Sequence, residues 1–402
     1  VNYQILVEEV ARETAELRGL PLKEAVSPVV LDRVGLKELL DKLLAAELPA
    51  EKVRGDSVTM IALDMLPAGS DISLLYSSLL EEQVGGLYDQ HTKSLYVVDT
   101  FNPKSLIGRI ILAHEICHAI QDQNFPIKEL PFSTDNDDQN MAMGSVLEGD
   151  ATLLMIEWAG ENFKPADLLM LNEVFNQSTE VLDEMPPALV QSLVFPYMQG
   201  SLFYAHMMVS GPEGWRNLPF EEPPASTEQI LHPHKYYPDR DEPTAVTLPD
   251  WEEQDGLEEV RRGVLGEWFT RLILTPEEMF PTISMMSRDV IVDHPPASSA
   301  AAGWDGDMAV TIASKDDEEW LVVWATEWDT IGDGDEFARY LESQIPRWNE
   351  GNPPVYTVEM AEDQAAERAR TWVALANTDR AFELARTLAL EAKEQYEVER
   401  GR

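Results

Sequence analysis

Apolar residues recur at helical spacing along most of the chain before the proline pair at 295–296. Residues 1–50 show this spacing with a break at Pro28, and residues 58–82 continue it with a break at 67–69. Further helical runs are predicted over 141–158, 166–175, 196–209 and 258–273. Such spacing is typical of amphipathic helices. The first part of the chain is therefore expected to be mainly helical.

The pattern changes after Pro295 and Pro296, where short apolar strands alternate with helices. The predicted strands are 308–313, 320–326 and 371–376, and the predicted helices are 335–345 and 380–396. Such a mixture favours a small α/β domain built on an antiparallel sheet. We therefore expect an α+β protein, which the length of 402 residues would divide into two or three domains. The expected parts are an N-terminal helical segment at 1–50, a main domain at 51–295 and an accessory domain at 296–402.

Two β-prone runs interrupt the helical part of the chain, at residues 84–88 and 94–98. The polar residues 89–93 join them, which predicts a β-hairpin. A helix is predicted next, with Asn102 as its N-cap and Pro103 as its first residue.

Two histidines stand four residues apart in this helix, at His114 and His118. Four residues make about one helical turn, with a rise of roughly 6 Å, so both imidazoles leave the same face and can bind one metal ion. Ile107 and Ile111 precede them on that face, where the pattern would otherwise place core residues. A pair of hydrogen-bonded core histidines is the alternative, but a metal is the simpler explanation. Glu115 would lie beside the ion without binding it.

A tetrahedral zinc site with two imidazoles and a water needs one more protein ligand. Glu148 is our choice, because it lies in an apolar helix and shares a face with small residues that can pack against a neighbour. Gly144 and Gly149 are expected to let this helix approach the histidine helix closely. Asp150 is predicted to accept a hydrogen bond from a ligand imidazole, and Asp122 is a weaker candidate for the same role. The alternative is an acidic pair on a partly exposed helix.

These residues resemble the gluzincins, the thermolysin-like zinc metallopeptidases with an HExxH motif and a glutamate on a following helix. The match covers His114, Glu115, His118 and Glu148. The chain is also similar to uncharacterised prokaryotic HExxH proteins through the segments GLYD (86–89), EGDA (148–151) and STEQILHP (226–233). That likeness extends over most of 55–240 and into the region 303–329. The NExxSD pattern of thermolysin is absent, and the acid after Glu148 falls at a different offset.

The resemblance implies a zincin-like main domain that hydrolyses peptide bonds through a water activated by Zn²⁺, with Glu115 as the general base. It also places the hairpin, through Gly86 and Tyr88, at the edge that binds an extended peptide. A hairpin that merely covers the helix is equally compatible with the pattern. Other divalent metals such as Mn, Co, Ni or Fe suit the same ligands.

The negative charge that develops during hydrolysis needs a hydrogen-bond donor besides the metal. His232, or otherwise Tyr237, is the candidate, because both lie in a Pro-rich segment outside the predicted helices. A histidine in such a loop is more often an ordinary surface residue.

The net charge of the chain limits which binding partners are expected. The chain carries 73 acidic and 30 basic residues, for a net charge of −43, so nucleic acid and anionic membranes are expected to be repelled. The acids are spread along the whole sequence, which favours a solvated surface over an acidic DNA mimic and is compatible with adaptation to high salt. No apolar run reaches the 18 residues of a membrane span. The expected partner is a peptide or protein substrate, and the pattern specifies no oligomeric state.

Two further features of the sequence bear on where the protein is located and on whether it is an enzyme. The single cysteine, Cys117, excludes an intrachain disulfide, and the start at Val1 suggests a processed product that is secreted or lipid-anchored outside the cytoplasm. The competing hypothesis is a binding or structural protein that keeps a zincin scaffold and cleaves nothing. Glu115 favours the enzyme, because a structural zinc site has no use for a general base.

Overall fold

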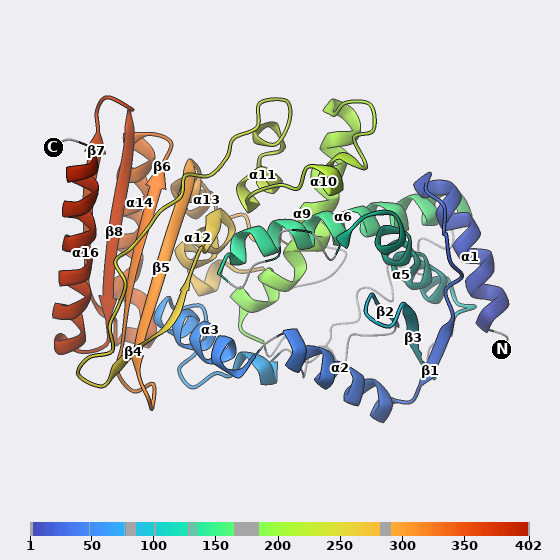
Figure 1. The fold of residues 1–402 in the computed structure, drawn as a ribbon, viewed down its shortest axis with the longest axis horizontal. Helices are drawn as coiled ribbons and strands as arrows, with labels where there is room; N and C mark the ends of the chain where they lie inside the picture. The colour runs from blue at the N-terminus through green and yellow to red at the C-terminus, as the bar shows by residue number, and fades with distance from the viewer. Residues whose placement is uncertain are drawn as a thin grey trace.

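Two β-sheets lie toward opposite ends of the molecule, and helices fill the space between them (Figure 1). The computed structural model describes residues 3–400 except 48, 76, 78–85, 100–101, 128–129, 131, 133–134, 165–184 and 282–290. Within this part the α+β class is confirmed. The helical run expected at 166–175 lies outside the described residues.

The helices of the described part are α1 (Tyr3–Arg18), α2 (Arg33–Glu47), α3 (Ala50–Ala62), α5 (Leu106–Asn124), α6 (Asp137–Asn162), α9 (Pro187–Ser210), α10 (Leu218–Glu221), α11 (Thr227–Leu231), α12 (Gly266–Leu274), α13 (Pro295–Ala301), α14 (Ile331–Gln344), α15 (Trp348–Gly351) and α16 (Asp379–Glu399). None of the helices in these described ranges combines the length and apolar character that crossing a membrane requires.

The small sheet contains the predicted hairpin. Strands β2 (Gly86–Asp89) and β3 (Ser94–Val98) pair antiparallel, and β1 (Pro28–Leu31) adds to the other side of β3 in parallel. The sequence pattern missed β1, because the proline that breaks the helical spacing starts a strand whose partner lies more than sixty residues later in the chain. Among the described strands, β2 therefore lies at an edge of this sheet, next to α5.

The large sheet has the order β4-β5-β6-β8-β7 and is antiparallel throughout. Its strands are β4 (Leu257–Gly263), β5 (Trp304–Ser314), β6 (Trp320–Trp328), β7 (Val355–Asp363) and β8 (Arg368–Ala376). The predicted antiparallel sheet is confirmed, although the pattern missed β7. The helix predicted at 258–273 is wrong: pairing with β5 makes 257–263 a strand, and only 266–274 is helical.

Alternation along the strands explains why helices cover both faces of this sheet. Val373 and Leu375 of β8 pack in the same cluster as Phe337 of α14, whereas Trp372 and Ala374 pack with the alanine-rich face of α16. The helix α16 forms the outer layer at this end of the molecule (Figure 1). The division at 295/296 stays a prediction. The edge strand β4 comes from before that point and pairs with β5 from after it.

Candidate metal centre

Helix α5 carries the two histidines and is anchored by its other faces. Ser105 caps the helix by accepting a hydrogen bond from the backbone N–H of Gly108, so the N-cap expected at Asn102 is wrong. Asn102 instead begins a turn that Ser105 closes with its own N–H. The sides of α5 that bear Ile110, Ala113 and Ile116 are buried in a cluster with α1 and the small sheet. The face with the histidines is only partly buried.

The structure brings together His114, His118 and Glu148. The Nε2 atoms of the two histidines lie 3.1 Å apart, and Oε2 of Glu148 lies 3.1 Å from Nε2 of His114 and 3.3 Å from Nε2 of His118. Their side chains are 12%, 18% and 24% exposed, so the group can be reached from solvent. The three predicted ligands therefore converge from two helices.

These distances can be compared with those of a zinc site. For bonds of about 2.0–2.1 Å and tetrahedral angles, two ligand atoms lie about 3.3–3.4 Å apart. The three observed distances, 3.1, 3.1 and 3.3 Å, are close to that value. The two imidazoles and one carboxylate are also a ligand set that catalytic zinc uses, with a position left for water. The residues fit the metal.

Charge within the group follows from its geometry. Burial of His118 disfavours its charged form, but the carboxylate of Glu148 outweighs this effect and raises the pKa of His118 to about 9. Burial likewise acts against ionised Glu148, and the two histidines more than offset it, which holds the pKa of Glu148 below its ordinary range. Glu148 is thus an anion that favours a cation between the side chains.

Glu148 lies on helix α6, and close packing of α6 against α9 determines its position. A Cβ atom on Gly149 would lie 2.3 Å from the backbone carbon of Gly200, and one on Gly200 would lie 2.2 Å from the carbonyl oxygen of Ser145. The glycine contact predicted with the histidine helix is therefore wrong, because Gly149 faces α9. Gly144 likewise faces Pro196, which lies inside α9.

Glu115 is held by the hairpin. Its Oε2 accepts a hydrogen bond of 2.7 Å from the backbone N–H of Tyr88 in β2. Burial raises the pKa of Glu115 above its ordinary value. A Cβ atom on Gly86 would lie 3.6 Å from Cγ of Glu115, so β2 runs directly beside the predicted base. The hairpin is therefore hydrogen-bonded to α5 at the residue that is predicted to act as the general base.

Asp122 and Asp150 do not contact the imidazoles as predicted. Asp122 accepts a hydrogen bond of 2.8 Å from the hydroxyl of Tyr88 and so fastens the hairpin to α5. Asp150 is fully buried and binds Arg18 and Arg216 at 2.8 and 2.7 Å. Asp150 follows Glu148 by two residues and so leaves α6 on the other side, whereas Asp122 lies one turn after His118 and has Tyr88 as its partner instead.

The partner of His118 is Gln121, which the sequence analysis did not select. Nδ1 of His118 lies 3.0 Å from Oε1 of Gln121. The sequence does contain a signal for this contact. Gln121 stands three residues after His118 and occupies a position that the helical pattern would fill with an apolar residue.

Tyr197 of α9 is a second residue that the sequence analysis missed. Its ring stacks on His114 with centroids 5.9 Å apart and planes 20° apart, and it is 41% exposed. The negative charge of Glu148, partial burial and the charge of Glu115 raise the pKa of Tyr197 well above its ordinary value. Its hydroxyl therefore keeps its proton beside Glu148 and is a donor at the centre. No local motif marks Tyr197, because only the packing of α9 on α6 brings it there.

The predicted donors His232 and Tyr237 make their described contacts with residues other than the three predicted ligands. His232 Nε2 lies 3.1 Å from the buried carboxylate of Glu267 in α12, with Arg271 alongside. Tyr237 packs against the hydrophobic core. Among the described contacts, neither residue reaches the three converging ligands. These contacts do not test the donor role itself, which stays a prediction.

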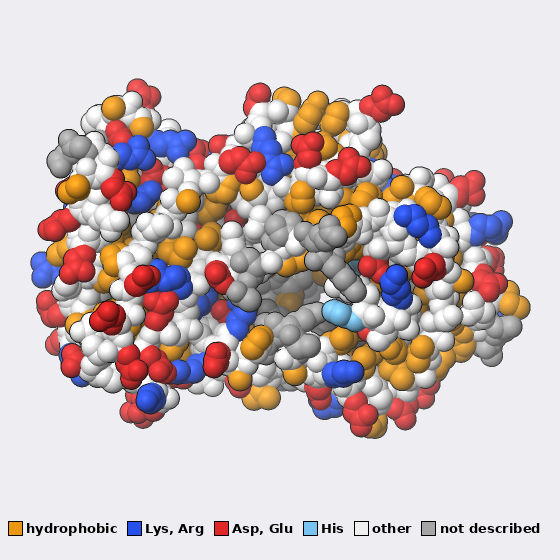
Figure 2. Space-filling model, viewed as in Figure 1, with side chains coloured by type: hydrophobic (Ala, Val, Ile, Leu, Met, Phe, Trp, Pro, Cys, Tyr) orange, Lys and Arg blue, Asp and Glu red, His pale blue; other side chains and the backbone are white. Residues whose placement is uncertain are grey.

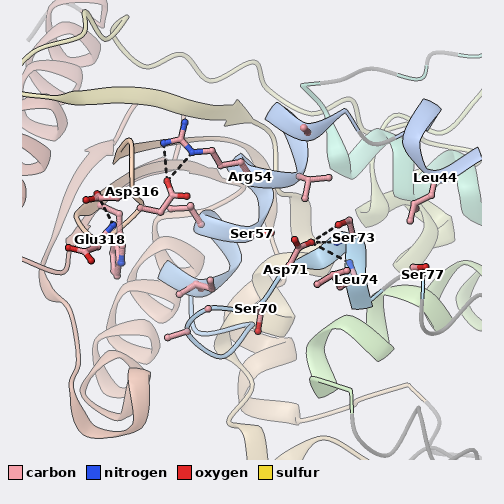
Figure 3. A pocket seen from close by; sticks show the side chains of 18 of the residues that line it. Leu44, Arg54, Ser57, Ser70, Asp71, Ser73, Leu74, Ser77, Asp316 and Glu318 are labelled. Atoms are coloured by element: carbon pink, nitrogen blue, oxygen red, sulfur yellow. Dashed lines mark hydrogen bonds and ion pairs between the residues drawn. The ribbon is translucent and has the colours of Figure 1, made fainter. Parts of the chain in front are cut away.

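The described part also contains a second group of acidic side chains and a large cavity. Glu228, Asp241 and Asp329 also converge, but Nζ of Lys235 lies 2.6–3.1 Å from all three and supplies their cation. A cavity of about 980 Å³ lies between α3 and the β5–β6 turn (Figure 3). Figure 3 shows that Asp71, on its wall, bonds to Ser73 and Leu74 of the helical turn that follows it. None of the three converging ligands lines that cavity.

Comparison with known proteins adds little to this geometry. A family described as a domain of unknown function (DUF8575) matches residues 253–388, which contain none of the three predicted ligands. No curated protein matches the chain. A solved structure from Chloroflexus aurantiacus, described as a hydrolase by provisional assignment with a novel fold, is 18% identical with a TM-score of 0.40. That match covers 58% of this chain and 88% of the other, and a score this low does not establish a shared fold.

Proposed function

We propose that this protein is a zinc-dependent peptidase whose metal is held by His114, His118 and Glu148. The observation that carries the proposal is the triangle of 3.1–3.3 Å between three ligand atoms on two helices, with Glu115 beside it. When bound, zinc lowers the pKa of a water molecule toward about 7 and polarises a carbonyl group.

Glu115 is the proposed general base. Tyr88 N–H holds its Oε2, so Oε1 is the oxygen that takes up the proton of the attacking water and passes it to the leaving amine. The raised pKa of Glu115 suits this role, because a base that must also act as an acid works best when its pKa approaches the working pH.

Tyr197 is the proposed donor to the oxygen that becomes negative. Its hydroxyl stays protonated at neutral pH and lies beside Glu148 and Glu115. A donor fixed at the site before reaction stabilises developing charge without the cost of reorienting water. His232, bound to Glu267, is not part of this proposal.

The edge strand β2 is the proposed docking edge for an extended peptide. It is the outer strand of the small sheet and runs beside Glu115. Backbone pairing with such an edge aligns a substrate through main-chain hydrogen bonds, which recur along any peptide. Gly86 and Tyr88 are the proposed residues of this edge; since the N–H of Tyr88 is bound to Glu115, the substrate would pair with other main-chain groups of β2. A peptide or protein is the expected substrate.

The test combines metal content with Glu115→Gln and Glu148→Ala. One zinc per chain is expected in the parent and in Glu115→Gln, but Glu115→Gln should cleave a peptide library at least about 10²-fold more slowly. Glu148→Ala should bind zinc far more weakly. Glu161→Gln, at an exposed position of α6, is the matched control and should resemble the parent.

Two results would decide against the enzyme. A parent protein that takes up no zinc when the metal is supplied would remove the proposed centre. Zinc binding without cleavage of any peptide in the library would instead favour a zincin scaffold used for binding.

A further inference from the structure

The side chain of Gln121 is completely buried and makes polar contacts on every side. Its nitrogen lies 3.0 Å from the carbonyl oxygen of Leu147 and 3.0 Å from Oδ2 of Asp150. Its oxygen lies 3.0 Å from Nδ1 of His118. Gln121 thus connects the histidine helix, the glutamate helix and a buried acid.

These partners determine which way the amide points. The carbonyl of Leu147 and the carboxylate of Asp150 both only accept hydrogen bonds, so they require the NH₂ group. The amide oxygen must then face His118, and it can be satisfied only by a hydrogen on Nδ1. The lone pair used for metal binding is consequently on Nε2, which faces His114 and Glu148.

Asp150 is in turn fixed by two arginines. Nε of Arg18 and Nε of Arg216 approach its two oxygens at 2.8 and 2.7 Å, and Arg216 also binds Glu157. Arg18 belongs to α1, far from the motif in sequence. A buried carboxylate held by two cations cannot rotate freely, so the Asp150 oxygen that faces Gln121 has a fixed position.

We infer that Gln121 is a positioning residue for the metal ligand His118, and that the buried ion pairs of Asp150 with Arg18 and Arg216 hold it in place. The inference rests on the proposed metal centre and deepens it. It names the group that selects the binding nitrogen of His118 and links α1 to the centre. Partners of this kind typically contribute 10- to 100-fold in metal affinity.

The test compares Gln121→Met with Gln123→Met in the full-length chain. Methionine keeps the length of the side chain but has no amide. Gln123 lies on the same helix and binds the backbone of Glu24, so its replacement also costs hydrogen bonds but touches no proposed ligand. Zinc affinity is measured by competition with a chelator, after circular dichroism has shown that both variants are folded.

We expect zinc affinity to fall about 10- to 100-fold in Gln121→Met and to stay within about twofold of the parent in Gln123→Met. A second readout separates positioning from general loosening. In the zinc-loaded parent, the Nδ1–H of His118 should give a slowly exchanging proton signal by NMR, which should be lost or exchange rapidly in Gln121→Met and persist in Gln123→Met.

A further variant, Gln121→Asn, keeps the amide but shortens the side chain by one methylene. It should also bind zinc more weakly, because the amide no longer spans His118 and Asp150. This variant replaces Gln121→Met in the affinity measurement if Gln121→Met does not fold. Equal zinc affinity in the parent and in a folded Gln121 variant would overturn the inference and leave the proposed peptidase intact. A parent that binds zinc but cleaves nothing would overturn the peptidase, and the affinities would still decide the role of Gln121.

Discussion

At the scale of single residues, the centre is organised around the negative charge of Glu148. That charge outweighs the effect of burial on His118 and keeps the phenol of Tyr197 protonated. His118 is thus a cation and Tyr197 a hydrogen-bond donor beside this carboxylate. A divalent metal would replace the proton between the imidazoles and the carboxylate.

Tyr197→Phe tests the proposed donor. We expect kcat to fall about 10²- to 10³-fold with little change in KM, because the lost hydrogen bond forms mainly as negative charge develops. Steady-state peptide hydrolysis measures both constants, and zinc content should be retained.

Tyr204→Phe is the matched control on the same helix. The hydroxyl of Tyr204 is buried with no hydrogen-bond partner among the described residues, so its removal should leave kcat unchanged. Equal kcat values for the parent and the Tyr197 variant would remove Tyr197 from the mechanism.

Asp138 should make stability depend on pH. Burial raises its pKa to about 8 from an ordinary value of 3.8. The folded protein therefore holds a proton that the unfolded chain has released, so this contribution to the free energy of unfolding falls as pH rises from about 4 to about 8. Asp138→Asn stays neutral, and its stability relative to the parent should rise across that window. Urea unfolding at several pH values measures the difference.

The neighbouring Asp137 provides the contrast. Burial opposes its ionisation, but Arg261 and Lys52 hold the pKa of Asp137 below its ordinary value. The pKa of the unfolded carboxyl is 3.8, so Asp137 is ionised in both states above about pH 5, and the stability offset of Asp137→Asn should be constant from about pH 5 to about 8. A pH-independent offset for Asp138→Asn would contradict the assignment.

At the scale of elements, the contact between α6 and α9 positions both Glu148 and Tyr197. Backbone meets backbone at Gly149 and Gly200, and no side chain fits between them. We expect Gly149→Ala to lower the free energy of unfolding by about 1–3 kcal/mol, because the added methyl group forces the helices apart. Urea unfolding measures this change.

Gly160→Ala, on the same helix, is the control for the contact. A Cβ atom at Gly160 meets nothing within 4 Å, so alanine should raise the stability by about 0.5–1 kcal/mol through helix propensity alone. If both variants changed stability in the same direction, steric exclusion at Gly149 would not be the cause.

At the scale of the whole molecule, charge repulsion acts against the compact state. The net charge is −43, and acidic side chains are scattered over the face shown in Figure 2 among fewer basic ones. Raising the salt from about 0.1 to about 1 M shortens the Debye length from about 10 to about 3 Å. We expect the melting temperature to rise, by about 2–4 °C for each 1 kcal/mol gained.

Calorimetry in NaCl and KCl of equal ionic strength checks this expectation, since screening depends on ionic strength and should act alike in both. The ion pairs of the surface weaken in the same salt, but the acids outnumber the bases by 43 and the repulsion should dominate. A melting temperature that falls with salt would show that the ion pairs contribute more than the repulsion.

What the sequence determined by itself was local. Helical periodicity fixes His114, Glu115 and His118 relative to one another whatever surrounds them, and two β-prone runs around a polar turn give the β2–β3 hairpin. Glu148 could be selected because an acid in an apolar helix needs a partner. The metal that would be that partner stays a prediction.

The tertiary structure decided which distant residues meet. Pairing with remote strands made strands of 28–31 and 257–263, where local pattern indicated a helix or a break. Packing of α9 on α6 brought in Tyr197, and Arg18 reached Asp150 across 132 residues of sequence. Periodicity describes the order of residues along one element, whereas these contacts depend on how separate elements pack. For that reason the sequence indicated the predicted ligands, and only the fold supplied the residues that contact them.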